Sequence, residues 1–277
     1  MKISIGIITS DNENKINTLL ASIKKQVLKN ITIDEIIIIS INKLNIEPDL
    51  KPKIKIIYEK KRNGKYYAIN SFLKKTRNKI TILCSGDIIL ENNFLELICK
   101  PFHSKTIGIV GAHPIPIEIK KTFISRVNKY IWDLHHLVSL VEPKVGEAIA
   151  FRNTGFLLPN TSVDEEMIAN ILIKQGFSKY YAKKAIIYNI PPTSISQYIN
   201  QRVRYFSGHL FLRKKYNYSA VSLNTVVVLK KLIQNLIISQ DKSIIFIAIL
   251  FEIYSRILGY FIYLFKKEMI IWKVWDN

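Results

Sequence analysis

A single acidic residue, Asp87, follows an apolar segment that carries no other charged side chain. In ITILCSGDIIL, residues 80–90, the run Ile80–Cys84 is typical of a buried strand, and two small residues separate it from Asp87. A carboxylate in this place suits Mg²⁺ or Mn²⁺, which bind one or two carboxylates together with phosphate oxygens and water. Such a cation would neutralise a leaving diphosphate. The alternative is that Asp87 caps the following turn or pairs with a lysine.

Two later segments also carry residues suited to chemistry or anion binding. VDEEMIA, residues 163–169, places three consecutive acids at a predicted helix start, where the helix dipole alone would favour them. QRVRYF, residues 201–206, combines Arg204, whose planar guanidinium can bind a diphosphate through two hydrogen bonds, with the neutral amide of Gln201. A solvated basic helix face is the alternative interpretation of this second segment.

The first half of the chain supplies elements that would bring such residues together. The predicted strands are the apolar runs at 3–8, 35–41, 54–58, 80–84 and 107–111, and the predicted helices are 16–27, 66–75 and 92–99. Strands apolar on both faces that alternate with helices indicate a parallel sheet covered on both sides. Ligands bind such sheets at the carboxyl ends of the strands. Thr9, Ser40 and Asp87 each lie just past a strand, so we expect them at one edge of the sheet.

Six short motifs, taken in order, resemble those of family 2 glycosyltransferases, nucleotide-sugar-dependent enzymes with the GT-A fold. SIGIITSDNENKI at 4–16, NGKYYAIN at 63–70 and CSGDIIL at 84–90 resemble the family's opening strand and donor loop, its lysine-bearing helix start and its Asp-x-Asp strand end. GEAIAFRN at 146–153, VDEEMIA at 163–169 and QRVRYFSGH at 201–209 follow in the family's order. The resemblance covers about residues 1–215.

The resemblance implies an α/β protein with a GT-A, Rossmann-like, mostly parallel sheet flanked by helices. Residues 1–215 would form the catalytic domain, and residues 216–277 a membrane-associating helical region. The implied reaction is an inverting transfer of a sugar from a nucleotide-diphosphate donor to a lipid-linked or glycan acceptor. Mg²⁺ or Mn²⁺ would be the cofactor.

The family's site residues carry over to particular positions of this chain. The expected donor- and nucleotide-binding residues are Thr9, Asn12, Ser40, Lys65, Ser85, Gln201 and Arg204. Asp87 would bind the metal, and His209 is a further candidate because GT-A enzymes often supply a late histidine. Glu165 takes the position of the general base, which deprotonates the acceptor hydroxyl, and Asp164 precedes it. A one-residue slip in the alignment would exchange these two roles.

Two departures from the family pattern leave other functions open. Ser40 stands where the family usually has an acid that helps to hold the nucleoside, and Ser85 replaces the first acid of the Asp-x-Asp pair. A catalytically inactive, glycosyltransferase-like membrane partner protein is therefore one alternative. A nucleotidyltransferase is another, but it would normally have a glycine-rich basic loop near the amino terminus, and TSDNENK is not one.

Composition narrows the partners. The 277 residues carry a formal net charge of +20, which attracts nucleic acid, anionic lipid headgroups or phosphorylated substrates. The basic residues are spread as short pairs, without a zinc finger, an aromatic RNA-binding signature or a basic recognition helix, so we expect no nucleic-acid partner. The two cysteines, Cys84 and Cys99, indicate no disulfide framework and are typical of a reducing cytoplasm.

The carboxyl-terminal region predicts membrane association. Ile244–Phe265 is long enough to span a bilayer, yet it contains Glu252 and Arg256, whose spacing would let them pair within one polar seam. Such a helix lies at a membrane interface or packs its seam against protein. Lys266 and Lys267 follow it and favour the cytoplasmic headgroup layer. Ser222–Ile238 is predicted to be an amphipathic surface helix. The alternative is that both helices pack on the catalytic domain or form a dimer contact.

Overall fold

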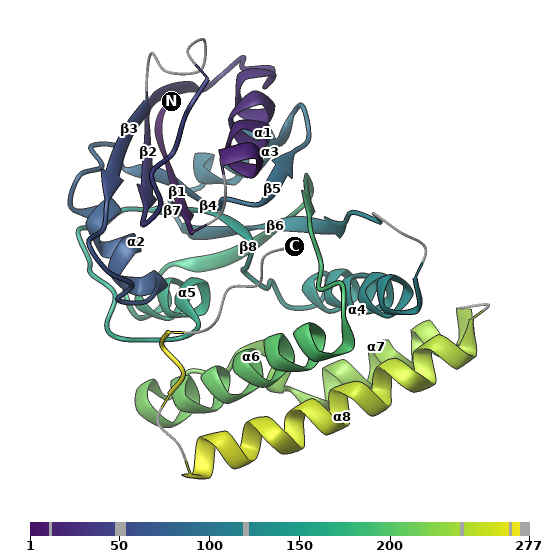
Figure 1. Ribbon diagram of the computed structural model, residues 1–277. Helices are drawn as coiled ribbons and strands as arrows, with labels where there is room; N and C mark the ends of the chain where they lie inside the picture. The colour runs from purple at the N-terminus through teal and green to yellow at the C-terminus, as the bar shows by residue number, and fades with distance from the viewer. Residues whose placement is uncertain (11–12, 48–53, 119–121, 239–240, 266–267, 272–277) are drawn as a thin grey trace.

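The predicted alternation of strands and helices produces one sheet with helices on both faces, as the computed structural model in Figure 1 shows. The structure describes residues 1–10, 13–47, 54–118, 122–238, 241–265 and 268–271. The strands are β1 (Lys2–Thr9), β2 (Thr32–Ser40), β3 (Ile54–Tyr58), β4 (Ile80–Ser85), β5 (Ile88–Leu90), β6 (Ile107–Pro116), β7 (Ala148–Arg152) and β8 (Ser178–Asn189). The helices are α1 (Glu13–Lys24), α2 (Lys65–Leu73), α3 (Phe94–Cys99), α4 (Phe123–Ser139), α5 (Asp164–Lys174), α6 (Ile195–Tyr216), α7 (Thr225–Ile238) and α8 (Lys242–Phe265).

The described strands form an eight-stranded sheet in the order β3-β2-β1-β4-β7-β6-β8-β5. The pairs β3–β2, β2–β1 and β1–β4 are parallel, which confirms the prediction for the amino-terminal half. The second half is mixed, because β7 runs antiparallel between β4 and β6. β6 and β8 are again parallel, and β5 pairs antiparallel with β8. The expected α/β fold is confirmed, and four of the seven pairings between the described strands are parallel.

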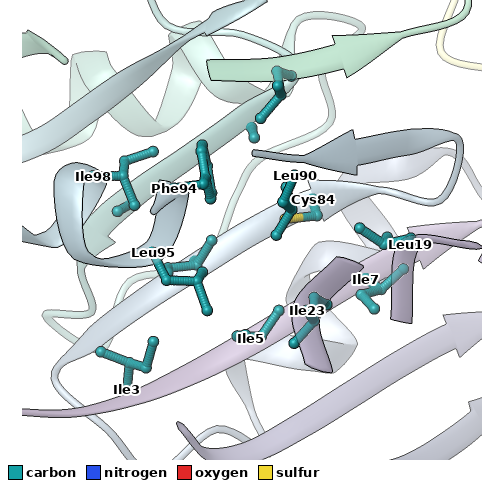
Figure 2. Close-up of a cluster of buried hydrophobic side chains, with 14 of the residues drawn as sticks. Ile3, Ile5, Ile7, Leu19, Ile23, Cys84, Leu90, Phe94, Leu95 and Ile98 are labelled. Carbon is teal, nitrogen blue, oxygen red and sulfur yellow. The ribbon is translucent and has the colours of Figure 1, made fainter. Parts of the chain in front are cut away.

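The core explains why the central strands lack a polar face. In β2, Ile36 and Ile38 point into one apolar cluster, whereas Ile37 and Ile39 point into another on the opposite face. The first cluster contains α1 and α3, and Figure 2 shows their side chains meeting those of β1 and β4. The second contains α2 and α5. Burial on both faces requires a continuous apolar run, and that run is what made these strands visible in the sequence.

The polar seam of α8 packs against α6 rather than closing on itself. Glu252 accepts two hydrogen bonds from the Arg202 guanidinium, at 2.5 and 2.8 Å, and a third from the Tyr198 hydroxyl at 2.7 Å. Arg256 instead donates to the Ser222 carbonyl at 3.2 Å. A Cβ on Gly259 would lie 2.9 Å from the Phe206 ring, so glycine permits the close approach of the two helices. The seam therefore joins α8 to the body of the protein.

The opposite surface of α7 and α8 is exposed and mostly apolar, with Lys230 and Gln234 of α7 also exposed. Figure 1 shows α8 as the outermost element, below α6. Its exposed apolar residues include Phe246 (62% exposed), Ile257 (51%) and Phe261 (53%), and α7 adds Val226 and Ile233. Among the described helices, α8 has the length and composition of a membrane span, and 28% of its most apolar window is buried. Lys266 and Lys267, which follow it, lie outside the described residues. A core helix of a soluble domain would be mostly buried, and this one is not.

Candidate active site

A cleft of about 950 Å³ opens at the carboxyl ends of the strands and extends to α6, α7 and α8. Thr9 ends β1, Ser85 ends β4, Lys65 begins α2 and Asp164 begins α5, so four separate elements present their termini to it. The cleft is lined by Thr9, Lys65, Ser85, Asp87, Asp164, Glu165, Gln201, Arg204 and His209, among other residues. The structure thus brings together nine side chains that the sequence singled out.

Two predicted site residues are not among those that line the cleft. Ser40 is buried at the end of β2, where its hydroxyl donates to the Asn42 carbonyl at 2.8 Å. Its neighbours Ile39 and Ile41 line the cleft in its place. Asn12 lies outside the described residues. The nucleoside-holding role expected of Ser40 therefore stays a prediction, and its hydroxyl is already used by the chain itself.

A lysine joins the donor motif to the acidic motif. The Lys65 ammonium lies 2.5 Å from Glu165 Oε1 and donates at 3.5 Å to the Ser85 hydroxyl. Burial, the largest single effect, would raise the pKa of Glu165, but the charge and hydrogen bond of Lys65, together with a backbone hydrogen bond and the charge of Arg204, lower it below its ordinary value. Burial alone would lower the pKa of Lys65, and Glu165 with Asp164 raises it instead. Glu165 is therefore an ionised carboxylate held by one cation.

Asp164 differs from Glu165 in its hydrogen bonding and in the direction in which its pKa is shifted. Its side chain is 1% exposed, and its Oδ1 atom has no hydrogen-bond partner within the described part of the chain. Burial first, and then the negative charge of Glu165, raise the pKa of Asp164 to about 7. Adjacent carboxylates whose pKa values are driven apart are typical of acid–base sites. The third acid, Glu166, accepts a hydrogen bond from the Tyr218 hydroxyl at 2.7 Å and is structural.

Asp87 shares its corner of the cleft with Glu147. Gly86 precedes Asp87 and lies so close to β1 that a Cβ would stand 2.4 Å from Thr9 Oγ1. Glu147 has a left-handed backbone (φ 58°), rare for a residue with a side chain, and its carbonyl accepts from the Ser85 amide at 3.4 Å. Burial, followed by the charge of Asp87, raises the pKa of Glu147 to about 7. A second carboxylate therefore stands near the predicted metal ligand.

This donor set fits a hard divalent cation that also takes ligands from a substrate. Asp87 and Glu147 offer two carboxylates, and Mg²⁺ or Mn²⁺ completes its shell with phosphate oxygens and water. No group of three or more His, Cys, Asp or Glu side chains that could hold a metal ion occurs among the described residues. His209 is buried among positive charges. Burial, followed by the charges of Lys144, Arg202 and Arg256, lowers its pKa to about 3. Surroundings of that sign favour an anion.

Helix α6 presents two functional faces. Gln201 and Tyr205 are one turn apart, and the Arg204 guanidinium lies 4.5 Å from the centre of the Tyr205 ring. The charge of Arg204 acts on the pKa of both Asp164 and Glu165, which places it on the acidic side of the cleft. Arg202, two residues and therefore about 160° around the helix from Arg204, faces α8 instead. The QRVRYF segment thus serves two regions with two arginines that one residue separates.

The sequence did not single out two residues that the cleft contains, Glu59 and Lys144, whereas Glu147 was already part of the GEAIAFRN motif. Glu59 follows β3, its Oε1 atom is buried without a hydrogen-bond partner among the described residues, and burial raises its pKa. Lys144 and Glu147 belong to the loop before β7. The available signals were weak: Glu59 and Lys144 stand in ordinary polar segments, whereas Gly146 and Glu147 directly precede an apolar strand.

Comparisons with known proteins give one family. A family model described as Glycosyl transferase family 2 matches residues 4–168, which is more than half of the chain. No curated protein sequence matches at a significant level. Solved structures are similar in fold only, at low sequence identity.

Three of these solved structures show how far the similarity of fold extends. The mannosyltransferase PcManGT from Pyrobaculum calidifontis, in complex with GDP-Man and Mn²⁺, is 14% identical with a TM-score of 0.66, covering 95% of this chain and 87% of that one. A mycobacterial protein is 13% identical with a TM-score of 0.53, covering 79% and 76%. TarS from S. aureus is 12% identical with a TM-score of 0.50, covering 95% of this chain and 55% of that one. The shared architecture includes the sheet and extends beyond the matched family region.

Proposed function

The chain belongs to glycosyl transferase family 2, and from that premise we propose that it is an inverting, metal-dependent glycosyltransferase acting at the cytoplasmic face of a membrane. The donor would be a nucleotide-diphosphate sugar, and the acceptor lipid-linked or a glycan. The observation that carries the proposal is the Lys65 ammonium, which links Ser85 of the donor motif to Glu165 of the acidic motif in the cleft that also holds Asp87.

The donor would lie along the strand ends. Thr9, Ser85 and the buried carboxylate oxygen of Glu59 offer polar atoms to the nucleoside. Lys65 and Arg204 supply positive charge for the diphosphate, and the Gln201 amide adds a neutral donor. Asp87, together with Glu147, would hold a divalent cation, which supplies charge neutralisation for the leaving diphosphate when it is bound. The Mn²⁺ found with GDP-Man in the mannosyltransferase of similar fold supports this part of the proposal.

The acidic pair would supply the base. The acceptor oxygen attacks the anomeric carbon as the bond from that carbon to the diphosphate oxygen breaks, and the hydroxyl proton passes to Glu165. In the free protein Lys65 holds Glu165 ionised but weakly basic. A donor diphosphate that draws Lys65 toward itself would weaken that ion pair and raise the basicity of Glu165. Binding of the donor would thereby prepare the base for the acceptor.

The alternative is a catalytically inactive membrane partner that keeps the fold. The serines at positions 40 and 85 favour it, because neither supplies the charge usual in the family. The second carboxylate at Glu147 and the divergent pKa values of Asp164 and Glu165 favour an active enzyme.

A donor screen separates these two functions. Purified protein with Mn²⁺, lipid vesicles and each of a set of nucleotide-diphosphate sugars should release nucleoside diphosphate from at least one donor, above the rate without protein. Calorimetry with nucleoside diphosphates and Mn²⁺ provides an independent measurement of nucleotide binding. A silent titration together with no release from any donor would support the inactive partner.

The region 216–277 would bind the membrane through the exposed apolar surface of α7 and α8. With its charged seam engaged by α6, α8 can lie in the interface without exposing Glu252 to lipid. The net charge of +20 would add attraction to anionic headgroups. We therefore propose an interfacial position, with α6 on the protein side of α8.

We expect the protein to float with vesicles that contain anionic lipid. The double variant Phe246→Glu/Phe261→Glu should lower the bound fraction at least about tenfold, because each change removes roughly 2 kcal/mol of apolar burial and adds a charge. Tyr67→Glu, on α2 and 46% exposed, is the matched control and should float like the unchanged chain. Equal flotation of the double variant and the control would contradict this surface.

A further inference from the structure

The charged side chains of the cleft fall into two sets. One set surrounds Asp87 and Glu165, and the other lies where α6, α8 and the loop before β7 meet. We call the basic members of the second set, Lys144, Arg202, His209 and Arg256, the cationic subsite; all four line the cleft. Burial first, and then the positive charges of Lys144, Arg202 and Arg256, lower the pKa of the His209 imidazole. Its Nδ1 atom is buried and has no hydrogen-bond partner in the described residues.

Among the described residues, Lys144 and Arg256 make no direct ion pair, although the charges of Glu166 and Glu252 act on Lys144 and that of Glu252 acts on Arg256. Arg202 is engaged by both carboxylate oxygens of Glu252. Among the described residues, Lys144 makes no hydrogen bond or ion pair, and burial followed by the charge of Arg202 lowers its pKa to about 8. Arg256 contacts the Ser222 carbonyl and the Phe206 ring, whose centre is 5.2 Å from the guanidinium carbon. Buried positive charge that makes no direct ion pair is costly, and an anionic ligand would offset that cost.

An apolar wall continues from the cationic subsite to the outer surface. Leu229 and Leu232 of α7 and Ile249 and Ile253 of α8 line the cleft. Leu229 is 52% exposed and Ile253 50% exposed, so this wall joins the apolar surface of α7 and α8. A ligand that complements both features has an anionic group at one end and an apolar chain at the other.

We propose that the cationic subsite binds the phosphate of an amphiphilic acceptor, a lipid whose phosphate joins an apolar chain to the hydroxyl-bearing group that receives the sugar. The inference rests on the proposed function and specifies its acceptor. Lys144 and Arg256 contact the phosphate oxygens, and the ion pair with Glu252 holds Arg202 beside them. The chain lies along α7 and α8 and continues into the membrane, and the hydroxyl-bearing group extends toward Glu165.

The donor diphosphate has a separate set of charges. The groups that act on the pKa of Glu147 are Asp87, Lys65, Glu165 and Arg204, and none belongs to the cationic subsite. Lys144 instead responds to Arg202, Glu166, Glu252 and Arg256. The cleft therefore provides for two anionic centres, one at the strand ends and one beside α8.

The test is equilibrium binding of radiolabelled hexadecyl phosphate to the full chain in neutral detergent micelles. Lys144→Ala and Arg256→Ala should each weaken binding at least about tenfold, because each removes a hydrogen bond to a charged group. Lys144→Arg should restore most of the affinity. Lys184→Ala, an exposed lysine on β8, is the matched control and should bind like the unchanged chain. Hexadecanol and inorganic phosphate should each compete at least about tenfold more weakly than unlabelled hexadecyl phosphate.

Three outcomes would overturn the inference. Equal competition by hexadecanol would show that the apolar wall alone binds, and equal competition by inorganic phosphate would show a site for free anions. Unchanged binding in both alanine variants, with thermal unfolding like that of the unchanged chain, would exclude these cations. Titration of the same samples with nucleoside diphosphate and Mn²⁺ reports on the donor site. Binding of nucleoside diphosphate without binding of hexadecyl phosphate refutes the subsite alone. Binding of hexadecyl phosphate without binding of nucleoside diphosphate refutes the proposed function.

Discussion

Asp87→Asn should lower sugar transfer by about three orders of magnitude while leaving the fold intact. The change keeps the shape of the side chain and removes the charge proposed to hold the cation at the diphosphate. Loss of that cation removes several kcal/mol of charge stabilisation from the leaving group, and each 1.36 kcal/mol is a factor of ten in rate. Release of nucleoside diphosphate at saturating donor measures the effect. Electron paramagnetic resonance of Mn²⁺ with nucleoside diphosphate should show weaker metal binding in the variant.

Asp133→Asn is the matched control for this experiment. Asp133 lies on α4, where it pairs with Lys129 at 3.0 Å with its side chain 55% exposed. It should retain both the rate and Mn²⁺ binding. If Asp87→Asn keeps full transfer in a Mn²⁺-containing assay, Asp87 is not the metal ligand. If it loses transfer but binds Mn²⁺ normally, Asp87 acts in another way.

The strands were predictable because their environment imposes one composition. A strand buried on both faces, such as β2, must be apolar throughout, and this pattern needs no knowledge of its neighbours. The direction of β7 leaves no such trace, because its short apolar run, Ala148–Phe151, is compatible with either orientation. The mixed second half of the sheet therefore emerged only from the structure.

The residues of the site also divide into those that the sequence predicted and those that it did not. Residues at element ends, such as Thr9, Lys65 and Asp87, were found because a motif fixes each of them locally. Partners that come from distant elements were not. The spacing of Glu252 and Arg256 would let them pair within α8, but the Arg202 guanidinium of α6 reaches both oxygens of Glu252. Such a two-point pair outcompetes a single contact along one exposed helix. Lys144 lines the cleft from the loop before β7, a segment that no motif marks.

The same contrast explains Ser40. Its position past a strand end predicted a ligand contact, and parallel strands do place it at the correct edge. The direction of its hydroxyl, however, depends on the turn that follows, where the Asn42 carbonyl accepts the hydrogen bond. Element ends predict location, whereas side-chain direction is set by neighbours that no motif specifies.

Glu165→Gln should reduce the rate of transfer by about 10²–10⁴-fold with donor binding retained, because an amide cannot accept the acceptor's proton. The pH dependence distinguishes it from Asp164. A base must be deprotonated, so kcat/KM rises with pH through the pKa of the base in the free enzyme. With Glu165 as base, that rise lies at acidic pH, because Lys65 lowers its pKa; with Asp164 as base, it lies near pH 7. Glu118→Gln, at an exposed position, is the control for the amide change.

Lys65→Met sharpens the same test, because it removes the cation that keeps Glu165 weakly basic. If Glu165 is the base, the rise in kcat/KM should move to higher pH in this variant, since burial then acts on the carboxylate without its counter-ion. The pKa of Asp164 also depends on Lys65, but less directly, because burial and Glu165 dominate it. A profile that starts near pH 7 and survives Glu165→Gln, but is lost in Asp164→Asn, would transfer the role of base to Asp164.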